Sequence, residues 1–167
     1  MIAAMFFAGF FTGSRTFTPI TVLCWFSWLA GYSLDHTWAA WTARPFTVLV
    51  LTLCALAEYI YDVCPIACSR KLFGPFLARL CFGALSGAVV AQAYTEPRIG
   101  GVLFGLFGSA VGTLVFFALR QRLALRLGRD LPIGLLESAF SLLLMIATAW
   151  HVRTGVVWIQ TIWGHMG

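Results

Sequence analysis

The chain has 167 residues, of which 60% are apolar and only 10% are charged, and its formal net charge is +5. About a quarter of the residues of a soluble domain are charged, so this composition excludes a water-soluble enzyme, a disordered tail and a collagen-like chain. It predicts an integral membrane protein that forms one domain over residues 1–167.

A helix needs about 20 apolar residues to cross the hydrocarbon core of a bilayer. Five stretches reach that length, at residues 2–32, 46–64, 75–95, 99–119 and 131–151. Residues 152–167 contain only a short apolar patch, which predicts a short C-terminal segment at the membrane interface. We therefore expect an all-α integral membrane bundle of five spans with a broken or kinked first helix.

The first span is interrupted at residues 13–19, which read Gly-Ser-Arg-Thr-Phe-Thr-Pro. Pro19 lacks a backbone N–H and disfavours helix at the residue before it. An unwound stretch survives in a membrane only inside protein or along a cavity, and broken helices form the binding sites of many transporters. One long helix with a proline kink is the alternative, and the sequence leaves both open.

A helix that begins near Pro19, beside Arg15, would suit an anion, because helix N-termini present free N–H groups. In either form of the segment, hydroxyl groups could satisfy the freed backbone groups, and these belong to Ser14, Thr16 and Thr18.

Five charged residues fall inside apolar spans: Arg15, Glu58, Asp62, Arg79 and Glu137. A charge that faces lipid near the bilayer centre costs about 2.5–3.5 kcal/mol. These side chains must therefore face inward and satisfy one another, or change protonation state. Glu58 and Asp62 share one helix face because they are four residues apart. We expect one polar cluster in the cytoplasmic half of the bundle, open toward the cytoplasm.

Three interpretations of this cluster stay open. It can be a substrate or ion site, or a structural network that fixes the helix register, or Asp62 and Arg79 can simply extend to the interface. Glu58 and Glu137 are the strongest candidates for a functional role. Two neighbouring acids share a proton, so a proton-coupled step is physically available.

Small residues recur at GxxxG spacing in the third and fourth spans. Such spacing lets helix backbones approach closely in lipid. It predicts either packing within the chain or a face for a homodimer, and we expect a homo-oligomer. The glycines are Gly83, Gly87, Gly101, Gly105, Gly108 and Gly112.

The loops predict the orientation. Basic residues concentrate in the second–third connection, at positions 70 and 71, and in the fourth–fifth connection, at positions 120–129. The positive-inside rule places both connections in the cytoplasm, so the N-terminus is expected inside and the C-terminus outside, in a bacterial inner membrane. The tryptophans, which favour the interface, all map to the outer half: Trp25, Trp28, Trp38, Trp41, Trp150, Trp158 and Trp163.

Other chemistries have weak support. No Ser/His/Asp grouping, phosphate loop or metal-ligand spacing is present, so no metal site and no cofactor are expected. The basic residues form no solvated stripe with interleaved aromatic residues, which argues against nucleic-acid binding. Cys64 and Cys68 form a CxxxC, for which a soft-metal or redox site and two reduced thiols remain open.

The chain resembles a family of uncharacterised membrane proteins, catalogued as domain of unknown function 4126. The resemblance rests on residues 13–19, on Glu58-Tyr-Ile-Tyr-Asp-Val-Cys-Pro65 and on Asp130-Leu-Pro132 followed by Glu137-Ser138. It implies a similar topology over most of the chain and supports the acid positions, but it implies no substrate. Two departures are Val63-Cys64, where the family often has a basic residue, and Ser138, where it often has aspartate.

These observations predict a small transporter or channel-like carrier for a small polar or anionic solute, with the lipid bilayer and that solute as its partners. Coupling to protons through the intramembrane acids is open to such a carrier. Arg15 would contact the solute or pair with acids, and Glu58 and Glu137 would bind ions or protons. One alternative is a membrane-embedded enzyme acting on a lipid or polyprenyl phosphate, although a catalytic role is less expected. The other is a non-catalytic membrane assembly subunit.

Overall fold

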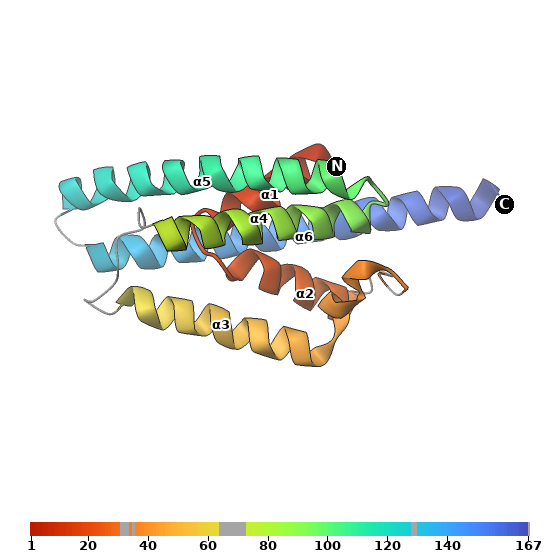
Figure 1. The fold of residues 1–167 in the computed structure, drawn as a ribbon, viewed down its shortest axis with the longest axis horizontal. Helices are drawn as coiled ribbons and strands as arrows, with labels where there is room; N and C mark the ends of the chain where they lie inside the picture. The colour runs from red at the N-terminus through yellow and green to blue at the C-terminus, as the bar shows by residue number, and fades with distance from the viewer. Residues whose placement is uncertain (31–33, 35, 64–72, 128–129, 167) are drawn as a thin grey trace.

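The structure, a computed structural model, describes residues 1–167 except 31–33, 35, 64–72, 128–129 and 167. The described residues are mostly helical and form no strand, which confirms the all-α class (Figure 1). The elements are α1 (Ile2–Thr12), α2 (Thr18–Ala30), the 3-10 helix η1 (Trp38–Ala43), α3 (Pro45–Val63), α4 (Phe73–Ala93), α5 (Arg98–Leu127) and α6 (Asp130–Met166).

The first apolar segment is a helical hairpin rather than one interrupted span. Helix α1 runs parallel to α5, since Gly9 lies against Gly105 and Gly13 lies against Gly112. Helix α2 runs antiparallel to α3. The Phe17 N–H, just before α2, donates to Glu58 late in α3, whereas Trp25, late in α2, donates to Thr52 earlier in α3. Because α3 and α5 point the same way (Figure 1), the chain reverses direction between α1 and α2.

The reversal has local causes in the sequence. Helix α1 ends at Thr12, and the N–H of Gly13 closes the last turn on Phe10. Residues 13–17 are not helical, which settles the choice between a kink and a break in favour of the break. Helix α2 then starts with Thr18 and Pro19, and proline is tolerated in a first helical turn because its missing N–H would have no helical partner there.

Glycines bring α1, α4 and α5 into close contact within the chain. A Cβ placed on Gly105 would meet the backbone of Gly83 on α4, and one placed on Gly112 would meet the backbone of Phe10 on α1. Gly87 and Gly101 face each other in the same way, and Gly108 lies against Phe6. The contacts of all six predicted glycines are therefore intramolecular, and a homo-oligomer, which stays a prediction, would need another surface.

Helix α6 differs from the prediction at its C-terminal end. A span over residues 131–151 and a separate interfacial segment were expected, but one helix continues to Met166. No proline interrupts this stretch, and Gly155 gives room to the ring of Tyr94, which lies against it. A helix of 37 residues rises about 56 Å, so its C-terminal end extends past the other helices (Figure 1).

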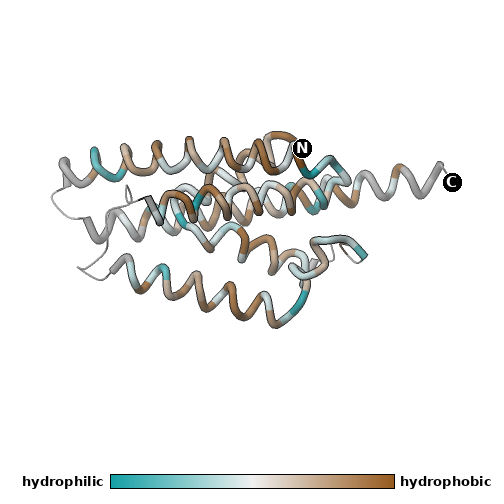
Figure 2. Tube along the Cα trace, in the orientation of Figure 1, coloured by the Kyte–Doolittle hydropathy of each residue, from teal (hydrophilic) through white to brown (hydrophobic). Residues whose placement is uncertain are grey.

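The outside of the molecule is apolar, and its buried residues include Arg15, Arg79 and Glu137 beside an apolar core. Among the described residues, three helical stretches are long and apolar enough to span a membrane: Gly74–Ala93, Arg98–Leu123 and Leu136–Trp158. Helix α3 exposes apolar side chains every three or four residues, and the tube in Figure 2 is correspondingly brown there. They are Phe46, Leu49, Leu53, Leu56 and Ile60. This distribution suits lipid as the solvent, and the chain is a membrane protein.

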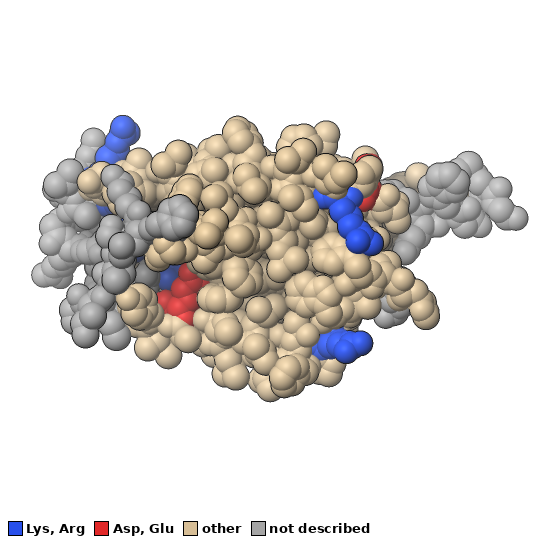
Figure 3. All heavy atoms as spheres, in the orientation of Figure 1, with Lys and Arg blue, Asp and Glu red and all other residues tan. Residues whose placement is uncertain are grey.

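The two ends of the bundle differ. The C-terminal ends of α3 and α5 and the N-terminal ends of α4 and α6 lie at one end, whereas η1, the α4–α5 turn, the start of α1 and the end of α6 lie toward the other (Figure 1). The tryptophan-rich elements belong to the second end, where Arg98 lies 5.2 Å from the ring of Trp38. On the face drawn in Figure 3, charged side chains lie toward the two ends and the middle is uncharged.

Candidate binding site at the hairpin tip

The unwound tip of the hairpin, residues 13–17, is buried against α3 and α6. The Ser14 hydroxyl donates a hydrogen bond to the Glu137 carboxylate at 3.0 Å. The Arg15 guanidinium donates to the Ser138 hydroxyl through Nε, at 3.1 Å, and through a terminal nitrogen. Arg15 is 3% exposed and Glu137 is 8% exposed. A basic and an acidic side chain are therefore both buried inside the bundle, and each makes a hydrogen bond between the tip and α6.

Glu58 holds the start of α2 from the neighbouring helix α3. Its carboxylate oxygens accept hydrogen bonds from the backbone N–H of Thr16, at 2.7 Å, and of Phe17, at 3.0 Å. The first N–H groups of a helix have no partner inside it, and negative charge is favoured at that end. The N-terminus predicted to suit an anion thus carries one, the carboxylate of Glu58.

Tyr59 completes the tip and was not predicted from the sequence. Its ring lies 4.8 Å from the Arg15 guanidinium carbon, and its hydroxyl accepts a hydrogen bond from Thr18 at 3.2 Å. Ser138 was noted only as a departure from the family pattern, although its hydroxyl accepts hydrogen bonds from the Arg15 guanidinium. Both residues follow a predicted acid directly, but only the folded arrangement brings them to the tip.

The predicted residues therefore divide into groups. Arg15, Glu58 and Glu137 all lie at the tip. The Ser14 hydroxyl was expected to satisfy freed backbone groups, but it donates to the Glu137 side chain. Thr16 contributes its backbone N–H to Glu58, whereas the expected contribution was a hydroxyl. Thr18 contributes its hydroxyl to Tyr59.

The remaining two candidates are Arg79 and Asp62. Arg79 is 7% exposed in α4, and the Ser109 hydroxyl donates to its backbone carbonyl at 2.7 Å, which joins α4 to α5. Asp62 belongs to α3, but its side chain lies outside the described part of the structure. The predicted polar cluster is therefore assembled from three segments of the chain around the tip, with Arg79 in a neighbouring helix pair.

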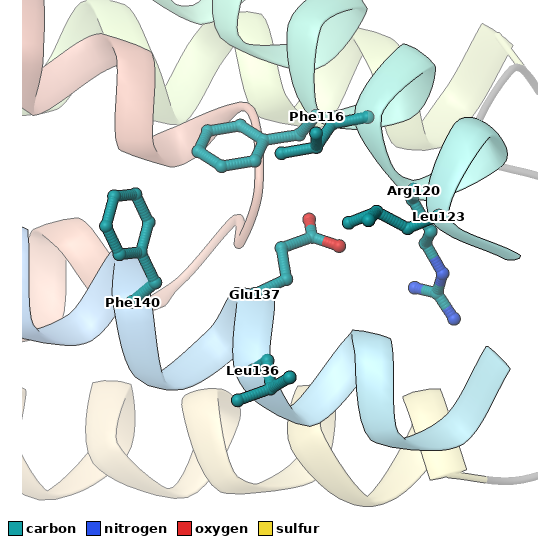
Figure 4. A pocket seen from close by; sticks show the side chains of 7 residues that line it. Phe116, Arg120, Leu123, Leu136, Glu137 and Phe140 are labelled. Atoms are coloured by element: carbon teal, nitrogen blue, oxygen red, sulfur yellow. The ribbon is translucent and has the colours of Figure 1, made fainter. Parts of the chain in front are cut away.

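A cavity of about 400 Å³ adjoins the tip between α5 and α6. Glu137 faces into it, and Arg120 reaches along its other side (Figure 4). The lining residues are Phe116, Leu119, Arg120, Leu123, Leu136, Glu137 and Phe140. Glu137, which accepts the hydrogen bond from Ser14, thus also lines the cavity.

Metal chemistry finds no support in the described residues, where no three His, Cys, Asp or Glu side chains gather closely enough to hold an ion. Cys24, Cys54 and Cys81 are free thiols. Cys64 and Cys68 lie outside the described residues, so their two predicted roles stay open.

Comparison of the chain with protein-family models, with curated proteins and with solved structures finds no match. The resemblance to the family of domain of unknown function 4126 accordingly stays a prediction.

Proposed function

We propose that the protein is a small membrane transporter or channel-like carrier for a small anionic solute, with the hairpin tip as its transport site. The observation that carries this proposal is the unwound stretch 13–17 inside an apolar bundle, which contains Arg15 and is held by Glu58 and Glu137. Irregular backbone at membrane depth requires protein or a cavity around it. Half-helix ends of this kind bind ions and solutes in secondary transporters.

The chemistry of the tip favours an anion. The N–H groups of Thr16 and Phe17 point at one site before α2, where the Glu58 carboxylate already binds. Arg15, the preceding residue, adds a positive charge to the tip and lies against Ser138 and the Tyr59 ring. A solute anion would compete with Glu58 for these donors. Protonation of Glu58 would remove its negative charge and weaken its hold, so anion entry and proton uptake would be coupled.

The topology that goes with this function has four crossing helices, α3 to α6, and a hairpin that enters from one side. Helix α3 has 19 residues and rises about 28 Å, close to the thickness of a bilayer core. The C-terminal end of α5, which carries Arg120 and Arg122, lies at the opposite end of the bundle from the start of α1 and the end of α6. The positive-inside rule then puts both termini outside the inner membrane, which replaces the five-span orientation.

Flux through purified protein tests the transport proposal. Reconstituted in liposomes with a trapped pH dye, the protein should move at least one of phosphate, sulfate and malonate together with protons. The variant Glu137→Gln should lower this flux by about ten-fold or more, because the amide cannot bind a proton and pairs differently with Ser14. Anion uptake is measured with radiolabelled solute under the same gradient.

Glu96→Gln is the matched control, since Glu96 lies in the α4–α5 turn at the far end of the bundle. It should keep wild-type flux. Flux in Glu137→Gln equal to that of wild type, or no movement of the three anions above protein-free liposomes, would contradict the proposal.

A further inference from the structure

The cavity between α5 and α6 opens sideways, toward the region where lipid chains lie. Its rim is formed by side chains on the outer surface, with Leu136 69% exposed, Phe140 56% and Leu119 48%. Its inner wall is formed by Phe116, which is 3% exposed, and Glu137. A volume of about 400 Å³ falls in the range of sites that hold small-molecule ligands.

The wall is suited to an amphipathic ligand. Five of its seven lining side chains are apolar, so a small hydrated ion would gain few partners there and would lose water. The two polar groups are Arg120 on α5 and Glu137 on α6, which Figure 4 shows on the same side of Phe140. A ligand that fills the cavity therefore needs an apolar chain and a polar head at one end.

The polar end of the cavity lies toward the basic end of the bundle. Arg120 is about two turns from the end of α5, and Arg122 follows it on the exposed surface of the same helix. Arginines in this position extend their guanidinium groups to the membrane interface. Basic pockets between transmembrane helices on the cytoplasmic side bind anionic lipid head groups.

We propose that this cavity binds one anionic phospholipid of the surrounding bilayer. An acyl chain lies along Phe116 and Phe140, the phosphate pairs with Arg120, and a hydroxyl of the head group donates to Glu137. Arginine pairs with phosphate in a planar, charge-assisted contact. The ligand enters from the side, between α5 and α6, and its binding does not depend on transport through the hairpin tip.

Lipid retention tests this site. Purified protein is placed in nanodiscs of phosphatidylglycerol and phosphatidylcholine in equal parts, extracted with mild detergent and weighed by native mass spectrometry. Wild type should retain one phosphatidylglycerol in preference to phosphatidylcholine. Arg120→Gln should lower that retention by about ten-fold, since it removes the charged partner of the phosphate.

Two variants separate the site from general attraction to a charged surface. Arg122→Gln removes the same charge from the same helix outside the cavity, and it should retain lipid as wild type does. Leu123→Trp should lower retention by filling the cavity while every arginine stays in place, and size-exclusion profiles verify that each variant is folded.

Equal retention of the two lipids by wild type, or equal losses in the Arg120 and Arg122 variants, would overturn the proposal. Retention that persists in Leu123→Trp would overturn it as well. Because the readout is bound mass rather than flux, a failure here is distinguishable from a failure of the transport proposal.

Discussion

At the scale of single residues, Glu58 stabilises the hairpin tip by accepting hydrogen bonds from its backbone. Two backbone N–H groups, of Thr16 and Phe17, would otherwise be left without partners at the start of α2. Leaving such groups unsatisfied in an apolar interior costs about 1–3 kcal/mol each. The N–H groups of Thr16 and Phe17 that would bind a solute anion therefore also stabilise the fold by binding Glu58. Glu58 and the solute anion would compete for this pair of donors.

Glu58→Gln tests the structural half of this competition. The amide keeps one acceptor oxygen but presents an N–H₂ group to the second donor, so the free energy of unfolding should fall by about 1–3 kcal/mol. Thermal unfolding in detergent measures the change, with Glu96→Gln as the control that should leave stability unchanged. Stability equal to wild type in Glu58→Gln would show that the carboxylate does not hold the tip.

At the scale of elements, α5 is fixed between α1 and α4 by glycines that leave no room for a side chain. Gly105 is the position where both partners meet, because Gly9 of α1 and Gly83 of α4 contact its backbone. In lipid, close backbone approach replaces the hydrophobic driving force for helix association. Since α1 forms the first arm of the hairpin, this packing also fixes the depth of the tip.

A pair of alanine substitutions in α5 tests this packing. Helix propensity alone predicts that glycine to alanine stabilises a helix by about 0.5–1 kcal/mol. Gly100→Ala should follow propensity, because nothing lies within 4 Å of a Cβ at that position. Gly105→Ala should instead destabilise by about 1–3 kcal/mol through overpacking.

Thermal unfolding of the two variants under the same conditions gives the comparison. If Gly105→Ala is as stable as Gly100→Ala, the close approach of α1, α4 and α5 is wrong.

At the scale of the whole molecule, the hairpin changes the topology. A first segment that crosses once gives an odd number of spans and termini on opposite sides. A segment that turns back at residues 13–17 brings both termini to the tryptophan-rich end. The polar tip nevertheless lies toward the end of the bundle where α5 carries Arg120 and Arg122, so the predicted polar cluster in the cytoplasmic half fits both topologies.

Reporter fusions distinguish the two topologies. Alkaline phosphatase, which is active only outside the cytoplasm, should be active when fused to either terminus and inactive when inserted near residue 126. A fluorescent protein that folds only in the cytoplasm should give the opposite pattern. Opposite results for the two termini would restore the five-span arrangement.

The sequence by itself determined the membrane class, the all-α class and an interruption at residues 13–19, because hydropathy, span length and proline act locally. It also singled out Arg15, Glu58 and Glu137, because the cost of a charge in lipid can be read without a fold, whereas the choice between a kink and a break needed the structure. Only the tertiary structure decided that the chain reverses at the tip, since that depends on Glu58 lying where it can accept the N–H groups of residues 16 and 17. The tertiary structure likewise decided the roles of Tyr59 and Ser138, the packing of the glycines within the chain and the cavity between α5 and α6. Each of these depends on contacts between segments that are far apart in the sequence, and no local sequence pattern shows which segments meet.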